Sequence, residues 1–229
     1  VQSASTVTER VTLQQTICRE GTAVLTDQQN LLLQPGESRT VSFRYCVDSP
    51  ALWSPENPNL YTSTMQVLEG EEELDREETG FGIRTLSIDA AHGVRINGQT
   101  VKLRGACIHH DNGILGAATL PDAEERRIRQ LKEAGFNAIR SSHHPAGRAL
   151  LDVCDRYGVL VMDELSDVWN VRKNPYDYAL YFEQDWKPTI QKMVAKDYNH
   201  PSVILYCVGN EISEAGSESG AETNRRLCN

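Results

Sequence analysis

The sequence lacks any long uninterrupted apolar run and any basic start followed by an apolar stretch. A membrane-spanning helix needs roughly 18 consecutive apolar residues, and a secretion signal needs the second pattern, so we expect no membrane partner. Basic residues are also in the minority, because 23 Lys and Arg stand against 32 Asp and Glu, a net charge of −9. Since clustered Lys and Arg bind phosphate backbones, this balance argues against a nucleic-acid partner.

Nucleotide and redox motifs are missing as well. No GxGxxG or Walker pattern follows any predicted strand, which argues against a nucleotide-binding sheet. The six cysteines are scattered without CxxC spacing, and several lie inside apolar runs, where cysteine behaves as a small core residue. A bridge between Cys18 and Cys46 stays open, and with it the cellular compartment.

The first part of the chain has the pattern of β-strands. Segments rich in Val, Thr, Leu and aromatic residues are separated by turns such as Gln34-Pro35-Gly36. The predicted strands span residues 7–17, 21–25, 38–47, 61–68 and 72–83. This spacing without helical runs predicts an antiparallel β-sandwich over residues 1–87.

From residue 88 onward, strand and helix patterns alternate. Asn97-Gly98 predicts a tight hairpin between strands at 94–96 and 101–103. Further strands are predicted at 103–108, 137–140, 159–162 and 202–208, with helices at 122–134, 146–157 and 182–198. Apolar strands alternating with helices indicate a parallel sheet that is buried on both faces. Such a sheet fits an open doubly wound fold or half of a barrel. We favour the first four βα units of a (β/α)8 TIM barrel, residues 88–229.

Polar residues gather where each of these four strands ends. The four groups are His109-His110-Asp111-Asn112, Arg140 to His144, Asp163-Glu164 followed by Asp167 and Trp169, and Asn210-Glu211. Four of the six histidines fall in these groups, and the opposite strand ends carry no comparable cluster. Because the active sites of TIM barrels lie at the carboxyl ends of the strands, the sequence predicts a site there.

Each candidate residue has a role to compare with a structural alternative. Glu211 follows a buried strand and is expected at the barrel mouth, where the alternative is an ordinary solvated glutamate. Arg140 is expected to pair with Asp163 or Glu164, because buried charges need partners. We assign Arg140 and Glu164 to structural support and Asp163 to the ligand. Trp169 would suit a place in the core equally well, and we assign it to the substrate, where its indole would stack on a sugar ring.

The histidines also raise the question of a metal site, because imidazoles and carboxylates together suit zinc. A metal-dependent barrel hydrolase would use His109, His143 and Asp163. However, the histidines come in adjacent pairs, and neighbouring side chains on a strand point to opposite faces. Only one of each pair can then face the pocket, so we predict no metal.

Several of these motifs together resemble glycoside hydrolase family 2, and within it the β-galactosidases. Residues 137–145 through 155–164 are similar to one signature of the family, and Asn199-His200-Pro201-Ser202-Val203 leading to Gly209-Asn210-Glu211 resembles its acid/base signature. Phe81-Gly82-Ile83-Arg84 resembles the junction between its immunoglobulin-like domain and its barrel. The resemblance covers nearly the whole chain and implies an immunoglobulin-like sandwich followed by the barrel.

The resemblance also implies roles. Glu211 is then the general acid/base, Asn210 contacts the sugar 2-hydroxyl, and His109 and His143 line the sugar pocket. A retaining glycosidase uses two carboxylates about 5 Å apart, one as acid/base with a raised pKa and one as nucleophile. His144 stands where the family has tyrosine, and 165–169 lacks the histidine with which some relatives bind magnesium, so we expect no cofactor.

The family's nucleophile lies on a later barrel strand than those in this chain, which opens at Val1 instead of methionine. We therefore expect a fragment that carries the acid/base but is inactive alone, with homo-oligomer formation through its open edges as a corollary. The expected substrate is a β-linked glycoside or oligosaccharide, and the lack of a basic residue for a sugar carboxylate favours β-galactosides. A non-catalytic carbohydrate-binding relative, a β-glucuronidase and a β-mannosidase are the alternatives.

Overall fold

The computed structural model describes residues 1–229, which fold as two compact units. The first unit comprises Val1–Ala51 and Asn59–Ile83, and the second comprises Leu52–Pro58 and Arg84–Asn229. The short segment 52–58 thus belongs to the second unit although the first surrounds it in the sequence. No sequence pattern indicated this.

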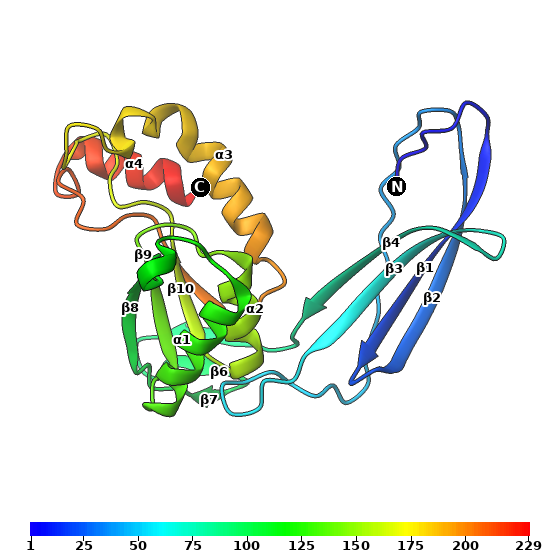
Figure 1. The fold of residues 1–229 in the computed structure, drawn as a ribbon, viewed down its shortest axis with the longest axis horizontal. Helices are drawn as coiled ribbons and strands as arrows, with labels where there is room; N and C mark the ends of the chain where they lie inside the picture. Colours follow the sequence, from blue (N-terminus) through cyan, green and yellow to red (C-terminus); the bar gives the residue numbers. More distant parts are fainter. The chain divides into compact units, whose positions relative to one another are not determined.

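The first unit is built on one antiparallel sheet with the strand order β2-β1-β3-β4 (Figure 1). The strands are β1 (Glu9–Arg19), β2 (Thr22–Leu33), β3 (Tyr61–Glu69) and β4 (Glu72–Phe81). A tight turn at Glu20-Gly21 connects β1 to β2, and one at Gly70 connects β3 to β4. All three residues have positive φ. Alternate residues of β1, Val11 and Leu13 among them, are buried, as expected when one face of a sheet is covered.

Residues 38–47 form no strand, which corrects one of the five strand predictions. Their side chains alternate between half-buried and exposed, as in a strand, but no neighbouring segment offers them a ladder of backbone hydrogen bonds. An apolar alternation predicts an extended chain, whereas a strand also needs a partner. One sheet of the predicted sandwich is therefore present in this chain.

The second unit opens with a small antiparallel sheet and continues into a parallel one. The small sheet consists of β5 (Leu86–Asp89), β6 (Gly93–Ile96) and β7 (Gln99–Thr100). The hairpin at Asn97-Gly98 is confirmed, although its second strand lies at 99–100 and not at 101–103. Both turn residues have positive φ, which this type of two-residue turn requires.

The parallel sheet has the order β11-β10-β9-β8, so successive strands are neighbours (Figure 1). Its strands are β8 (Gly105–His109), β9 (Ala138–Ser142), β10 (Leu160–Glu164) and β11 (Val203–Cys207). The helices are α1 (Pro121–Glu133), α2 (Arg148–Tyr157), α3 (Phe182–Asp197) and α4 (Glu218–Cys228), with 3-10 turns at Gly113–Leu115 and Tyr178–Leu180. An antiparallel β unit followed by parallel βα units of a partial TIM barrel is the predicted fold, and it is confirmed.

The two faces of the parallel sheet are covered differently. Ile139 and Val161 pack with Ile128 of α1 and Leu151 of α2 in a fully buried core. The opposite face carries the intervening residues of each strand, among them Arg140 and Met162, and lines an open apolar hollow. The sheet therefore has a helix-covered face and an inner face, and the strand period of two decides which side chains reach each.

Segment 52–58 is anchored on the second unit by specific contacts. Trp53 is fully buried and its Nε1 donates to the backbone oxygen of Asp155 in α2 at 2.9 Å. Gly158 ends α2 with φ +65°, and a Cβ there would lie 2.4 Å from the backbone oxygen of Pro55. Glycine is thus required by both the left-handed turn and the close approach.

Helix α3 continues through Pro188, which lies inside it. All six cysteines are free, so Cys18 and Cys46 are not bridged. None of the helices combines the length and apolar character needed to cross a membrane.

Candidate active site at the carboxyl ends of the parallel strands

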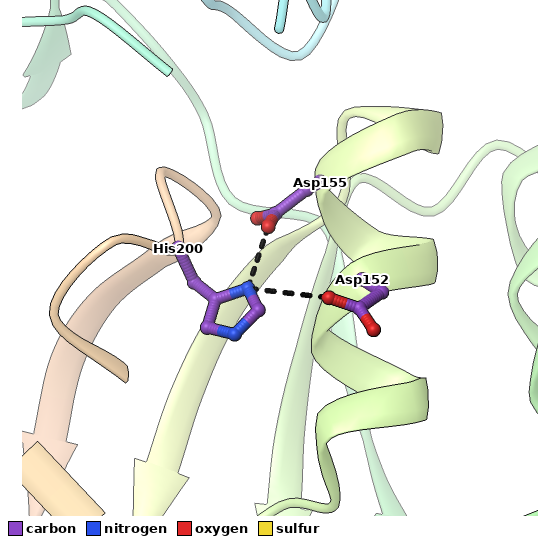
Figure 2. A group of neighbouring side chains, drawn as sticks. All are labelled: Asp152, Asp155 and His200. Carbon is purple, nitrogen blue, oxygen red and sulfur yellow. Dashed lines mark hydrogen bonds and ion pairs between the residues drawn. The ribbon is translucent and has the colours of Figure 1, made fainter. Parts of the chain in front are cut away.

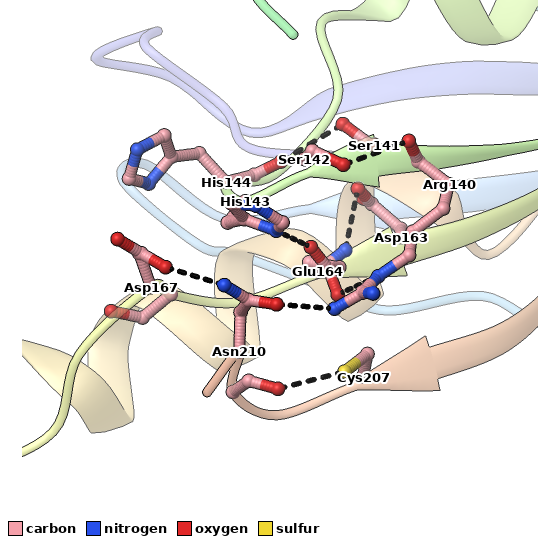
Figure 3. Close-up of polar contacts among 12 residues, drawn as sticks. Arg140, Ser141, Ser142, His143, His144, Asp163, Glu164, Asp167, Cys207 and Asn210 are labelled. Carbon is pink, nitrogen blue, oxygen red and sulfur yellow. Dashed lines mark hydrogen bonds and ion pairs between the residues drawn. The ribbon is translucent and has the colours of Figure 1, made fainter. Parts of the chain in front are cut away.

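The side chains that follow β8, β9, β10 and β11 lie at one end of the sheet, because all four strands run parallel. His109 ends β8, His143 follows β9, Glu164 ends β10 and Asn210 follows β11. Most of these side chains appear together in Figure 3, with the hydrogen bonds that join them. Of the residues predicted at the strand ends, one hydrogen-bonded group contains Arg140, His143, Glu164, Asp167 and Asn210.

Glu164 is the centre of this group. Its carboxylate is fully buried, and it accepts hydrogen bonds from Nε of Arg140 and from Nδ1 of His143, the latter at 2.6 Å. A buried carboxylate is stable only when it is paired and hydrogen-bonded, and these two partners meet that need. The predicted pairing of Arg140 with a neighbouring carboxylate is thus present, with Glu164 as the partner.

Asn210 connects β11 to the same group. Its Oδ1 accepts a hydrogen bond from Nη2 of Arg140 at 2.9 Å, and its Nδ2 donates to Oδ1 of Asp167 at 2.8 Å. Its backbone nitrogen donates to the oxygen of Ser166 at 3.2 Å. A donor on one side and an acceptor on the other fix which way the amide points. One lone pair and one N–H of the amide remain free for a ligand.

Glu211 lies on an exposed turn directly after Asn210, with a left-handed φ of 44°. This conformation costs a residue with a Cβ about 1–2 kcal/mol, so surrounding contacts must maintain it. Gly209 lies so close to the indole of Trp169 that a Cβ there would be 2.8 Å from Nε1. That Nε1 donates to the oxygen of Val208 at 2.8 Å. Trp169 therefore supports the turn that presents Glu211.

Trp169 is only 4% exposed and packs with Leu165, Phe182 and Met193. Of the two roles left open for it, the core is the one that the structure shows. A buried indole whose N–H is already bonded to backbone is not available to stack on a sugar ring. This corrects its assignment to the substrate.

Asp163 also departs from its assignment to the ligand. It lies on the helix-covered face, because adjacent strand residues face opposite ways and Glu164 takes the inner face. Its fully buried Oδ1 accepts from the backbone nitrogens of Ala146 and Glu164, at 2.8 and 3.1 Å, and Lys196 lies 3.5 Å from its Oδ2. Burial and the charge of Asp197 raise the pKa of Asp163 to about 7. Its role is structural.

The histidines form two pairs across neighbouring strands. The rings of His109 and His143 meet edge to face with centroids 5.2 Å apart, and His109 is exposed. The rings of His110 and His144 are 6.3 Å apart, and burial together with the neighbouring His110 lowers the pKa of His144. Since Asp163 faces the helices, it does not converge with His109 and His143 as the zinc hydrolase alternative requires.

Three further residues of the site had no assigned role in the sequence-based prediction. Lys173 contacts Oδ1 of Asp167 at 3.0 Å and the backbone oxygen of Asn210 at 2.9 Å. Oε1 of Glu214 accepts from the backbone nitrogens of Asn170 and Val171, at 2.8 and 3.2 Å. Lys173 and Glu214 lie outside the strands, where no periodic pattern marks them. Only the position of Asp167, shortly after a strand end, offered a signal.

A second group of polar side chains lies at the opposite, amino end of the sheet (Figure 2). Nδ1 of His200 is 2.6 Å from Oδ2 of Asp155 and 4.0 Å from Oδ1 of Asp152. Oδ1 of Asp155 accepts from the backbone nitrogen of Ser202 at 3.1 Å. Although the three side chains are close enough to hold a metal ion, these contacts already account for the cluster as the connection between α2 and the start of β11.

Glu211 is the exposed carboxylate at the strand ends that can exchange a proton with a bound ligand, while Glu164 and Asp167 are engaged by hydrogen bonds. Glu164 is occupied by Arg140 and His143, and Asp167 by Asn210 and Lys173. Glu211 has no such partner among the three and is exposed to solvent. The arrangement therefore suits general acid/base chemistry beside an amide that can orient a hydroxyl group.

Comparison with known proteins agrees with this geometry. Residues 90–224 match the TIM barrel domain of glycosyl hydrolases family 2, and residues 1–84 match a second model of that family. The chain is 41% identical over 204 residues to a beta-galactosidase of Bacteroides ovatus, covering 89% of this chain and 24% of that protein. It is 40% identical over 166 residues to a putative beta-glucuronidase of Formosa agariphila, covering 72% of this chain and 16% of that protein.

Among solved structures, a glycosyl hydrolase family 2 member from Bacteroides cellulosilyticus is similar with a TM-score of 0.90 and 43% identity. The match covers 97% of this chain and 29% of that one. The chain thus spans at most about a quarter of the length of the named relatives and less than a third of this structure. Both units are matched by models of one family, and the chain belongs to glycosyl hydrolase family 2.

Proposed function

We propose that the chain is part of a retaining β-glycosidase in which Glu211 is the general acid/base. The observation that carries this proposal is the turn after β11, where Glu211 is exposed while the preceding Asn210 is held between Arg140 and Asp167. A carboxylate on a supported turn at the mouth of a barrel can reach a glycosidic oxygen. The fixed amide of Asn210 beside it can restrict the orientation of the sugar.

In the proposed reaction, Glu211 first protonates the leaving oxygen while a second carboxylate attacks the anomeric carbon. The glycosyl ester is then hydrolysed by a water molecule from which Glu211 removes a proton. The free lone pair and N–H of the Asn210 amide are suited to the sugar 2-hydroxyl. His109 is exposed at the end of β8 and its ring contacts that of His143, which supports the proposal that the two line the sugar pocket.

A neutral sugar, with β-galactosides first, is the proposed substrate class. The two cations within the strand-end group are already paired, Arg140 with Glu164 and Lys173 with Asp167. A sugar carboxylate would therefore find no unpaired cation in this group. The beta-galactosidase from Bacteroides ovatus supports the galactoside, while the putative beta-glucuronidase keeps β-glucuronides as the alternative, and β-mannosides are a further one.

We further propose that these 229 residues do not turn over glycosides by themselves. The parallel sheet has four strands, and a closed TIM barrel has eight. The second carboxylate that a retaining mechanism needs is then supplied by a longer protein comparable in length to the relatives. A non-catalytic carbohydrate-binding protein is the competing function.

The test compares the complete protein with its Glu211→Gln and Glu218→Gln variants on a panel of aryl β-glycosides. Glu218 is an exposed glutamate at the start of α4 and serves as the matched control. Because general acid/base catalysis contributes about 100-fold or more, we expect Glu211→Gln to lose at least that factor in kcat and Glu218→Gln to keep full activity.

Two more measurements separate the alternatives. Azide should restore turnover to Glu211→Ala and give a β-glycosyl azide, because the small anion attacks the glycosyl ester without needing a base. Sugar binding without cleavage by the complete protein would instead establish the carbohydrate-binding alternative. The aryl glycoside hydrolysed fastest identifies the sugar.

A further inference from the structure

Lys173 lies in the connection between β10 and α3, and its ammonium group bridges two strand ends. Nζ is 3.0 Å from Oδ1 of Asp167 and 2.9 Å from the backbone oxygen of Asn210. Asp167 in turn accepts from Nδ2 of Asn210 at 2.8 Å. Lysine, aspartate and asparagine therefore form a closed ring of three hydrogen bonds directly before Glu211.

The carbonyl that Lys173 holds belongs to the peptide bond between Asn210 and Glu211. Holding this oxygen fixes the plane of the peptide, and the plane sets the direction from which the Glu211 side chain leaves the backbone. Glu211 has a φ of 44°, a conformation that its own Cβ disfavours. The turn therefore depends on contacts from outside itself, and Lys173 supplies a charged one.

Lys173 is itself held in place by its own loop. The backbone nitrogens of Lys173 and Asn174 donate to Oδ2 of Asp177, at 2.7 and 2.8 Å. Further back, Glu214 accepts from Asn170 and Val171 and ties the same loop to the segment after Glu211. The ammonium group is thus presented by a connection that is bound on both sides of the residue it supports.

The charge of Lys173 also matters for its partner. Burial raises the pKa of Asp167, but the hydrogen bonds from Asn210 and Lys173 outweigh this and bring it below its ordinary value. Asp167 thus stays ionised and keeps accepting from both donors throughout the neutral range.

We propose that Lys173 is a positioning residue for the acid/base: bound to Asp167, it holds the Asn210–Glu211 peptide so that the Glu211 carboxyl group points at the glycosidic oxygen. This inference rests on the proposed function of Glu211. It adds a residue whose contact with the reaction is indirect. In this proposal the ammonium group acts through the peptide that it holds and not by contact with the sugar.

The test exploits the fact that only poor leaving groups need a proton. Lys173→Met, Lys173→Arg and the control Lys192→Met, an exposed lysine on α3, are compared in the complete protein. For each, kcat/KM is measured on an alkyl β-glycoside and on a 2,4-dinitrophenyl β-glycoside of the same sugar. The ratio of the two values does not depend on the fraction of protein that is folded.

We expect Lys173→Met to lower kcat/KM about tenfold or more on the alkyl glycoside and less than about threefold on the dinitrophenyl glycoside, since a misplaced acid loses part of its contribution. The ratio of the two kcat/KM values should return close to that of the unchanged protein in Lys173→Arg. In Lys192→Met the ratio should be unchanged. An equal loss on both substrates, or no loss, would overturn the positioning role.

Glu211→Ala is measured on the same pair of substrates to separate this inference from the function on which it rests. If that variant shows no dependence on the leaving group, the acid/base assignment itself fails. If Glu211→Ala shows the dependence and Lys173→Met does not, only the role of Lys173 is wrong.

Discussion

Two adjacent carboxylates of β10 show how much depends on a single residue step. Glu164 faces the site and binds Arg140 and His143, whereas Asp163 faces the helices and binds backbone nitrogens. The sequence correctly predicts that the pair divides its tasks and that Arg140 has a carboxylate partner. The sequence does not show which carboxylate lies on which face of the sheet. Both faces of this strand carry apolar residues, so the apolar pattern does not distinguish them.

The raised pKa of Asp163 predicts a specific dependence of stability on pH. Its ordinary value is 3.8 and its value in the folded protein is about 7. Between these values the folded state retains a proton that the unfolded state has released, so the free energy of unfolding falls as pH rises from about 4 to 7. Above pH 7 this contribution is fully lost.

Asp163→Asn should flatten that slope, because the amide cannot ionise while its oxygen can still accept from Ala146 and Glu164. Urea unfolding at a series of pH values measures it. All three tryptophans (Trp53, Trp169 and Trp186) lie in the second unit, so their fluorescence reports on the unit that contains Asp163. Equal slopes in both proteins would show that Asp163 titrates normally.

Among the elements, the continuous apolar strands and the helices α1, α2 and α3 are well predicted from sequence. The exceptions have physical causes. Residues 38–47 alternate correctly but lack a pairing partner, and α4 was missed because its sequence is mostly polar and buries only Gly220, Thr223 and Leu227. The loop residues Lys173 and Glu214 were missed since tertiary contacts, not periodicity, define their roles.

The end of α2 offers a test of packing at the level of an element. Gly158→Ala should lower the free energy of unfolding by about 2–4 kcal/mol, because a left-handed Cβ costs about 1 kcal/mol and the collision with the oxygen of Pro55 adds to it. Gly135→Ala is the control, since Gly135 has a φ of +89° with open space around it. An equal loss of unfolding free energy in the two variants would mean that segment 52–58 moves away from the added Cβ without cost.

In the molecule as a whole, the inner face of the parallel sheet is an apolar surface left open. It is an apolar hollow lined by, among others, Leu103, Ala138, Met162 and Leu205, and no helix of the chain covers it. An exposed apolar surface of this kind favours association with other apolar groups.

We expect the 229-residue chain to bind the dye 1-anilinonaphthalene-8-sulfonate through this hollow, with a clear rise in fluorescence. Met162→Lys should reduce the signal, because it places a charge on the inner face. Ile88→Lys, which changes an exposed apolar residue of β5, should leave it as it was. If both variants behave alike, the dye binds elsewhere.

The contacts that surround Glu211 have a consequence for constructing chimeric enzymes. Residues 165–181 and 209–217 are tied to each other through Lys173 and through Glu214, on either side of Glu211. Replacing one of these loops with that of a relative would separate matched donors from their acceptors. Transplanted together they would keep their shared hydrogen bonds, so these two loops are the smallest unit by which specificity could be exchanged at this side of the barrel.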